Sequence, residues 1–286
     1  MTVHVENLIP DFLAFWEQSQ DLSLPEQKRL WQTLYEELHR DVFDVYYSRW
    51  GNPARLEEAL LKFPEVVPRL PELSHNIQTR IAGIVTRCAR LFAAPEIDLD
   101  VVVMVGSFTS NGWLTFFRGK PTVFLALECF ATPRYLELLI AHELAHGFHA
   151  QCSATPWAEF AIGEALFGEG LAIVASANIC PDATEEETLW FKTGYADWLA
   201  ECAARWPELR RRFLADLAKI DEPLYASYFG EKGPAAGLPK RAGYFVGARV
   251  IQSLSQQHTL AELARWSPER AVAETRRTLE GLTGPG

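Results

Sequence analysis

Apolar side chains recur at intervals of three and four residues through the first part of the chain, a spacing typical of helices. The pattern is clear at Phe12, Phe15 and Trp16 and continues until Gly51-Asn52-Pro53 interrupts it. A further helical stretch follows the prolines at positions 64, 68 and 71. We therefore expect residues 1–93 to form a helical N-terminal region.

The pattern changes after Pro95, where the short apolar runs typical of strands begin. Strands are predicted at residues 97–105, 113–117 and 122–127. Asn111-Gly112, between the first two, is a strong signal for a two-residue hairpin turn. These features predict a small antiparallel sheet directly before a long helix.

Helical spacing returns after the sheet and continues towards the C-terminus. Thr132 and Pro133 suit the N-cap and the first position of a helix. A capping box ending at Glu187 opens a helix expected over residues 184–205. Residues 221–240 contain glycine and proline and are predicted to form a loop.

Together these elements predict an α+β fold, mainly α, with a helical region at 1–93 and a second region at 94–286. The net charge of −10 argues against nucleic acid or an anionic membrane as the main partner. We find no run of about 18 apolar residues, so no membrane span is expected. The N-terminus lacks the features of a secretory signal, and the five cysteines form no CxxC pair, so we expect a cytoplasmic location.

The strongest chemical signal lies on the long helix, in His142-Glu143-Leu144-Ala145-His146. Two histidines four residues apart lie on the same face of a helix, where both can reach one tetrahedral Zn²⁺. The glutamate between them can take a proton from a water molecule on that metal. The spacing therefore predicts two metal ligands, His142 and His146, and a general base, Glu143.

A catalytic zinc takes three protein ligands and one water, so a third ligand is required. Glu169 lies on the next predicted helix, which should pack antiparallel to the first. His149 is closer in sequence, but it lies about 10.5 Å along the helix axis from His142, too far for both to share one ion. Cys129 ends a predicted strand, and a buried apolar role suits it better. His149 is expected to line the cleft, to support a ligand, or to lie at the surface.

The combination of His142–His146 with a downstream Gly-Glu-Gly-Leu-Ala segment resembles the gluzincin metallopeptidases. It is more similar still to bacterial families described as predicted zinc-dependent proteases. Those families share an aromatic helical N-terminal part, an apolar strand before the zinc helix, an E-G-x-A motif and a later G-Y-x-x-G segment. The corresponding segments here are Phe12–Trp16, Thr122–Leu127, Glu169–Ala172 and Gly243–Gly247.

The resemblance implies a thermolysin-like catalytic core in which His142, His146 and Glu169 bind zinc and Glu143 is the general base. It implies that Tyr244 stabilises the negatively charged oxygen, the oxyanion, that forms when the peptide bond is attacked. Tyr225, Tyr228 and His258 remain alternatives for this role. Glu164 is expected to face solvent rather than to support a ligand.

The resemblance also implies that a peptide substrate pairs with an edge strand ahead of the zinc helix. The matching stretch is Trp113, Leu114, Thr115 and Phe116. The G-x-M-E-N signature of aminopeptidases is missing, so an exopeptidase role of that kind has no support.

The function expected from these residues is zinc-dependent hydrolysis of peptide bonds in a peptide or protein substrate. The alternative is a catalytically silent protein that keeps the fold for binding or regulation, and an intact Glu143 argues against it. A helical protein without metal is a third option. The sequence gives neither the cleavage preference nor the oligomeric state.

Overall fold

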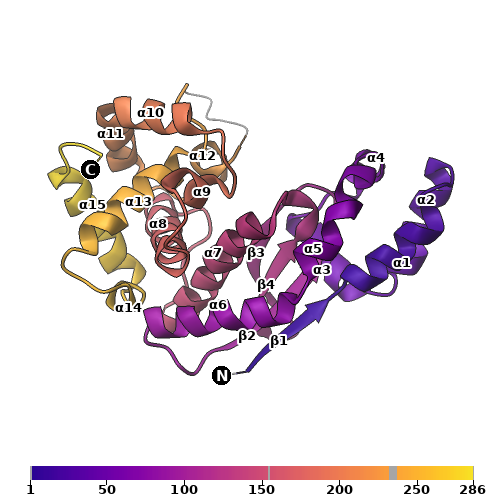
Figure 1. Cartoon of the computed structure of the whole chain (residues 1–286). Coiled ribbons are helices and arrows are strands. Elements are labelled where there is room, and N and C mark those ends of the chain that lie inside the picture. Colours follow the sequence, from indigo (N-terminus) through magenta and orange to yellow (C-terminus); the bar gives the residue numbers. More distant parts are fainter. Residues whose placement is uncertain (1, 154, 232–236, 286) are drawn as a thin grey trace. The chain divides into compact units, whose positions relative to one another are not determined.

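A small mixed sheet lies in the first of two units that make up the chain (Figure 1). The computed structural model describes residues 2–153, 155–231 and 237–285. Helices account for 64% of the chain, which confirms an α+β protein that is mainly α. The first unit contains Met1–Gly83 and Asp98–Glu143, and the second contains Ile84–Ile97 and Leu144–Gly286.

The sheet has the strand order β1-β2-β4-β3. Its β1–β2 and β2–β4 pairs are parallel, and only β3 runs antiparallel to its neighbour. The expectation of an antiparallel sheet is therefore wrong, because β2 runs parallel to both of its neighbours, the N-terminal strand β1 and β4. The helical interpretation of residues 1–93 is wrong at β1. The strands are β1 (Thr2–Asn7), β2 (Asp98–Met104), β3 (Gly112–Phe117) and β4 (Lys120–Ala126).

A two-residue turn at Arg118 and Gly119 joins β3 to β4, whereas the hairpin predicted at Asn111-Gly112, between the first two strands of this region, does not form. The φ angles of Arg118 and Gly119 are 48° and 81°, the left-handed values that a tight hairpin of twisted strands requires. Gly112 instead opens β3 opposite Leu125 of β4. The hairpin prediction at Asn111-Gly112 was wrong because β2 pairs with β4 rather than with β3.

The helices of the first unit bury a cluster of aromatic rings. Trp31 packs 5.0 Å from Tyr35 and 5.6 Å from Phe63, measured between ring centroids. Tyr35 lies in a π-helical turn, Gln32–Glu36. The hydroxyl group of Tyr35 accepts a 3.0 Å hydrogen bond from the backbone N–H of Val105. The helices are α1 (Ile9–Ser19), α2 (Leu24–Trp31), α3 (Arg40–Arg49), α4 (Leu56–Val66) and α5 (Leu70–Ser74), with short 3₁₀ turns at Pro53–Arg55, Val67–Arg69 and Leu127–Cys129.

Two helices continue through the boundary between the units, α6 (Ile77–Leu91) and α7 (Pro133–Cys152). The start of α7 confirms the prediction from Thr132 and Pro133, since Thr132 Oγ1 accepts a 3.5 Å hydrogen bond from the Tyr135 backbone. The other helices of the second unit are α8 (Ile162–Ile179), α9 (Glu185–Trp190), α10 (Ala196–Ala204), α11 (Trp206–Asp216), α12 (Glu222–Phe229), α13 (Ala242–Leu254), α14 (Leu260–Leu263) and α15 (Pro268–Gly281).

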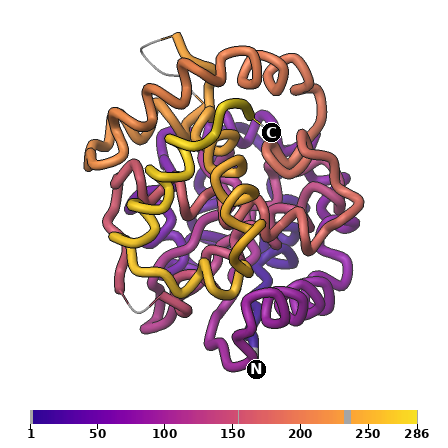
Figure 2. The backbone as a smooth tube through the Cα atoms, turned by 90° about the vertical axis from the view of Figure 1, so that its left-hand side faces the viewer, coloured from indigo at the N-terminus to yellow at the C-terminus, as the bar shows by residue number. Residues whose placement is uncertain are grey.

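Helix α8 is the central helix of the second unit. Helices α11, α13, α14 and α15 all pack against it, and α15 lies alongside α13 (Figure 2). Within the described residues, α8 is the one helix long and apolar enough to cross a membrane by length and composition, and 67% of it is buried inside the protein. Its apolar character thus matches its central position in the packing.

Helices α8 and α13 cross at a pair of glycines. A Cβ atom added to Gly170 would lie 2.2 Å from the carbonyl oxygen of Gly247, and one added to Gly247 would lie 2.4 Å from the carbonyl oxygen of Leu166. Real Cβ atoms do not approach backbone atoms so closely, so both positions require glycine. This crossing explains two of the sequence motifs together, E-G-x-A on α8 and G-Y-x-x-G on α13.

Two predictions about the second unit need correction. The helix expected over residues 184–205 begins at the predicted capping box, but Phe191 ends it with a left-handed φ of 54°. The chain turns at Gly194 and resumes as α10. The loop expected at 221–240 contains α12, which is capped by the Asp221 side chain; residues 232–236 of that loop lie outside the described part.

Candidate metal centre

Helix α7 places two histidines one turn apart on an unbroken helix. His142 is buried, with 3% of its surface exposed, and His146 is partly buried. The run of apolar residues around them, including Leu139, Leu144 and Phe148, is fully buried and holds α7 within the protein interior. Both imidazoles are therefore fixed by helix geometry and by packing rather than by a flexible loop.

Glu169 on α8 faces the second of these histidines. Its Oε2 lies 3.4 Å from Nε2 of His146. Two donors bound to one ion at about 2.1 Å with a tetrahedral angle between them would be separated by about 3.4 Å. The ligand atoms of His142, His146 and Glu169 all lie within 4.8 Å of one another. These three side chains form a group that could hold a metal ion, and two nitrogens with one carboxylate oxygen are a donor set that zinc accepts.

Glu143 lies against the first residue of β3. A Cβ atom added to Gly112 would be 2.9 Å from Cγ and 3.2 Å from Oε1 of Glu143, and 2.9 Å from Cδ2 of Leu139. Gly112 is thus small because the strand approaches the Glu143 side chain closely. Glu143 is itself buried, with 7% exposure.

The four residues proposed to meet a substrate strand lie on β3, which is an edge of the sheet. They do not share one environment. Trp113 is buried and packs nearly parallel to Tyr46, Trp50 and Phe124 at 5.1–5.5 Å. Its ring therefore belongs to the core, whereas Phe116 is 70% exposed and Leu114 and Thr115 are half-buried.

Tyr244 lies in the first turns of α13, three residues before the glycine crossing with α8. The guanidinium carbon of Arg241 is 4.1 Å from the centre of its ring, and Phe229 packs edge-on at 5.9 Å. Tyr244 and Glu169 thus belong to the two helices that meet at Gly170 and Gly247, each within one helical turn of the crossing.

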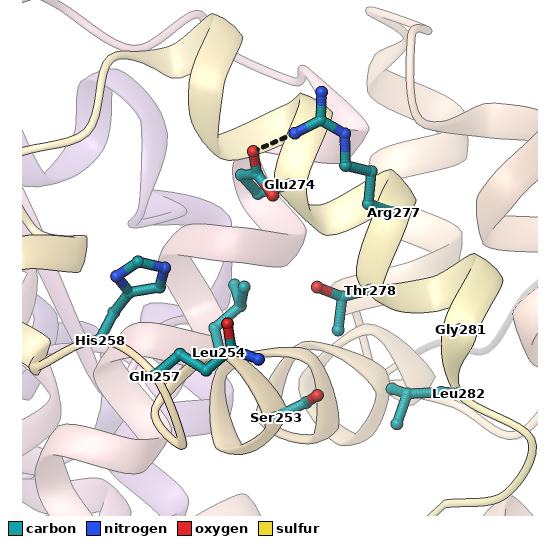
Figure 3. A pocket seen from close by; sticks show the side chains of 9 residues that line it. All are labelled: Ser253, Leu254, Gln257, His258, Glu274, Arg277, Thr278, Gly281 and Leu282. Carbon is teal, nitrogen blue, oxygen red and sulfur yellow. Dashed lines mark hydrogen bonds and ion pairs between the residues drawn. The ribbon is translucent and has the colours of Figure 1, made fainter.

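The three alternatives to Tyr244 occupy other places. Tyr228 is buried, and its hydroxyl donates a 2.6 Å hydrogen bond to Asp216, while Tyr225 packs against Phe160 and Phe229. His258 follows the C-terminal end of α13, the opposite end from Tyr244. There it lines a pocket of about 300 Å³ with residues of α15 (Figure 3).

Three further candidates are separate from the His-His-Glu group. His149 is buried rather than at the surface, 4.5 Å from the Trp157 ring, and burial together with the charge of His146 lowers its pKa to about 3. Cys129 is exposed, so the expectation of a buried apolar cysteine is wrong. Glu164 is half-buried, and its carboxylate accepts a 2.5 Å hydrogen bond from the Ala158 backbone in the exposed loop before α8.

A buried acid that the sequence did not single out lies beside the strand ends. Glu128 lies in the 3₁₀ turn that follows β4 and is 1% exposed. Its Oε1 accepts a 3.2 Å hydrogen bond from the Phe108 backbone, and burial raises its pKa to about 7. The loop that it holds also receives Tyr46, whose hydroxyl bonds Ser107 and Thr109. The same loop leads to Gly112, so Glu128 supports the segment that packs on Glu143.

We predict that Glu128→Gln removes a pH dependence of stability. The folded-state pKa of about 7 exceeds the usual 4.5, so the folded protein binds the proton more tightly. The contribution of the Glu128 carboxyl to the free energy of unfolding is therefore fully present below pH 4.5 and is lost as the pH rises through 7. Relative to the variant, the wild-type free energy of unfolding should fall by up to about 3 kcal/mol between pH 5 and 8 in urea titrations.

Glu58→Gln is the matched control. Lys62 and Arg55 hold the pKa of the Glu58 carboxyl below its usual value, so this group does not titrate between pH 5 and 8. Its difference from wild type should be constant over that range. A constant difference for Glu128→Gln as well would show that Glu128 is charged in the folded state throughout.

The fold and this group of residues define a mainly helical α+β protein with a candidate His-His-Glu metal centre. The chain belongs to the family described as predicted Zn-dependent protease (DUF2268), whose model matches residues 78–272. Comparisons with curated proteins and with solved structures give no match. The matched region contains all three candidate ligands, Glu143 and Tyr244.

Proposed function

We propose that this protein is a zinc-dependent peptidase of the gluzincin type. The observation that carries the proposal is the meeting of His142, His146 and Glu169 in one group with donor atoms within 4.8 Å, with Glu143 between the two histidines in sequence. The family description supports the same metal and the same reaction. A purely structural metal site needs no general base, so Glu143 favours catalysis over a silent binding role.

His142, His146 and Glu169 would hold the zinc ion. When bound, the ion would supply Lewis acidity and would lower the pKa of a bound water to about 7. Glu143 would take a proton from the attacking water and deliver it to the leaving amine. Tyr244 would donate a hydrogen bond to the oxygen of the tetrahedral intermediate.

The substrate would bind as an added strand along the open edge of β3. That edge begins at Gly112, directly against Glu143, so a paired peptide would have its backbone near the general base. Leu114, Thr115 and Phe116 would contact its side chains, while Trp113 would hold the strand in place from the core. We propose peptides or proteins of the cytoplasm as substrates, without nucleic acid or membrane as a partner.

We predict that Glu169→Ala weakens zinc binding about 100-fold, because it removes one of three ligands. Cys129→Ala should bind zinc as the wild type does, since Cys129 lies outside the group. Zinc stoichiometry by mass spectrometry after dialysis against a weak chelator measures both. Glu169→Gln, which preserves side-chain shape, separates loss of the ligand from misfolding. Full zinc retention in Glu169→Ala would remove Glu169 from the site.

A further inference from the structure

Three cations surround one stacked aromatic pair in the second unit. Trp190, the last residue of α9, stacks on Tyr195 with ring centroids 3.8 Å apart and planes 10° from parallel. The side-chain charges of Lys192, Lys240 and Arg241 lie 5.6, 5.1 and 4.9 Å from the centroid of the Trp190 ring. We call these three residues the cationic cluster.

The carboxylate of Glu186 lies beside the cluster, where it accepts a hydrogen bond from the backbone of Tyr195. In the part of the chain that the structure describes, none of the cluster's three members forms an ion pair within 4.0 Å of a carboxylate. The chain as a whole has a net charge of −10, so carboxylates are abundant elsewhere. Three like charges held around one ring repel one another, and cation–π contacts offset only part of that cost. An anionic ligand would relieve it.

Arg241 distinguishes this cluster from an ordinary surface patch. It is only 8% exposed, its Nε is buried without a hydrogen-bond partner, and Nη2 donates a 3.0 Å hydrogen bond to the Leu189 carbonyl. A buried guanidinium without a carboxylate is rare, because its desolvation is costly unless a partner is supplied. Lys192 and Lys240 are exposed, so the cluster combines a fixed buried cation with two accessible ones.

The cluster is connected through α13 and α8 to Glu169, the candidate ligand that lies in the same unit. Arg241 lies directly over the Tyr244 ring at 4.1 Å. Tyr244 lies one turn before Gly247, which packs on Gly170, the neighbour of Glu169. Arg241 lies six residues before Gly247 in sequence, which corresponds to about 9 Å along the axis of α13. That distance corresponds to a few residues of an extended peptide.

We propose that Lys192, Lys240 and Arg241 form a subsite for a carboxylate group of the peptide substrate. The carboxylate comes either from an acidic side chain or from the C-terminus of the peptide. This inference rests on the proposed peptidase function, because it names the substrate class of that same site. It gives the enzyme a preference for acidic peptides or for cleavage near a free C-terminus.

The test measures peptide binding without turnover, using zinc-loaded full-length Glu143→Gln and calorimetry. The probes are three N-acetylated octapeptides of alanine, phenylalanine and glutamine. One is neutral with an amide end, one has glutamate for glutamine, and one is neutral with a free carboxyl end. The glutamate peptide, the free-acid peptide or both should bind about three- to tenfold more tightly than the neutral one. Which of the two gains identifies the source of the carboxylate.

The double substitution Lys192→Gln and Lys240→Gln should abolish this preference. The matched control removes two ion-paired lysines elsewhere, by Lys28→Gln and Lys219→Gln, and should keep it at the same net charge. Equal binding of all three peptides, no binding of any, or a preference that survives loss of Lys192 and Lys240 would overturn the proposal. If the wild type cleaves peptides without a charge preference, the peptidase proposal stands and the carboxylate subsite is removed. If the protein binds acidic peptides selectively but the wild type cleaves none, the peptidase proposal is removed and the carboxylate subsite stands.

Discussion

A Glu143→Gln variant is expected to bind zinc as the wild type does and to lose peptidase activity by about 10³-fold or more. Glutamine has the shape of glutamate, so it preserves the contact with Gly112 and the packing of α7. It cannot accept the proton of the attacking water at neutral pH. Hydrolysis of a quenched fluorescent peptide library and zinc content measured on the same sample test both parts.

Glu164→Gln is the control for this substitution. Glu164 is a second glutamate on α8, the helix that carries Glu169, and glutamine can still accept its hydrogen bond from Ala158. The control should cleave peptides at close to the wild-type rate. If Glu143→Gln also cleaved at the wild-type rate, the general base would have to be another residue. If neither the wild type nor the variants cleaved any library member while holding zinc, the silent binding function would be favoured.

The second large effect is expected at the glycine crossing. Gly170→Ala should destabilise the second unit by about 3–4 kcal/mol, because the new methyl group would lie 2.2 Å from the Gly247 carbonyl oxygen. Neither helix can relieve that contact by rotating a side chain, since both contacting groups are backbone. The helices must separate, and Glu169 must move with them, so zinc binding should weaken as well. Thermal unfolding and zinc titration measure the two effects.

Gly168 provides a control two residues away on the same helix. A Cβ atom added there meets no other atom within 4 Å. Gly168→Ala should therefore stabilise the protein by about 0.5–1 kcal/mol, as alanine does at an open position inside a helix. Equal effects of the two substitutions would show that helix propensity, rather than the crossing, determines the role of Gly170.

The features that the sequence predicted well depend on local spacing. The helical spacing of His142 and His146 and the capping signals at Thr132 and Thr184 are each contained within a few residues, and the structure has them. The parallel strand pairing could not be read in that way, because β1 pairs with a strand that begins at Asp98. No periodicity connects two segments so distant in the chain.

Two further features were missed because tertiary contacts override the local signal. Asn111-Gly112 has the composition of a hairpin turn, but the glycine is there to let β3 approach Glu143. Phe191 ends α9 in a left-handed conformation that bulky residues rarely adopt, and the turn that results creates the Trp190–Tyr195 stack. The burial of Glu128 likewise depends on residues from α3 and from the loop after β2.

The open edge of β3 has a consequence for the behaviour of the protein in solution. An edge strand that can accept a peptide can equally accept a strand from another copy of the same chain, which is a route to aggregation. Phe116 presents a large apolar side chain there, 70% exposed. Charged residues at the end of an edge strand usually oppose such pairing, and here they are Arg118 and Lys120. Both already form ion pairs, Arg118 with Glu6 and Asp41, and Lys120 with Asp98. Phe116→Lys would therefore be the first substitution to introduce when a more soluble form of the protein is needed.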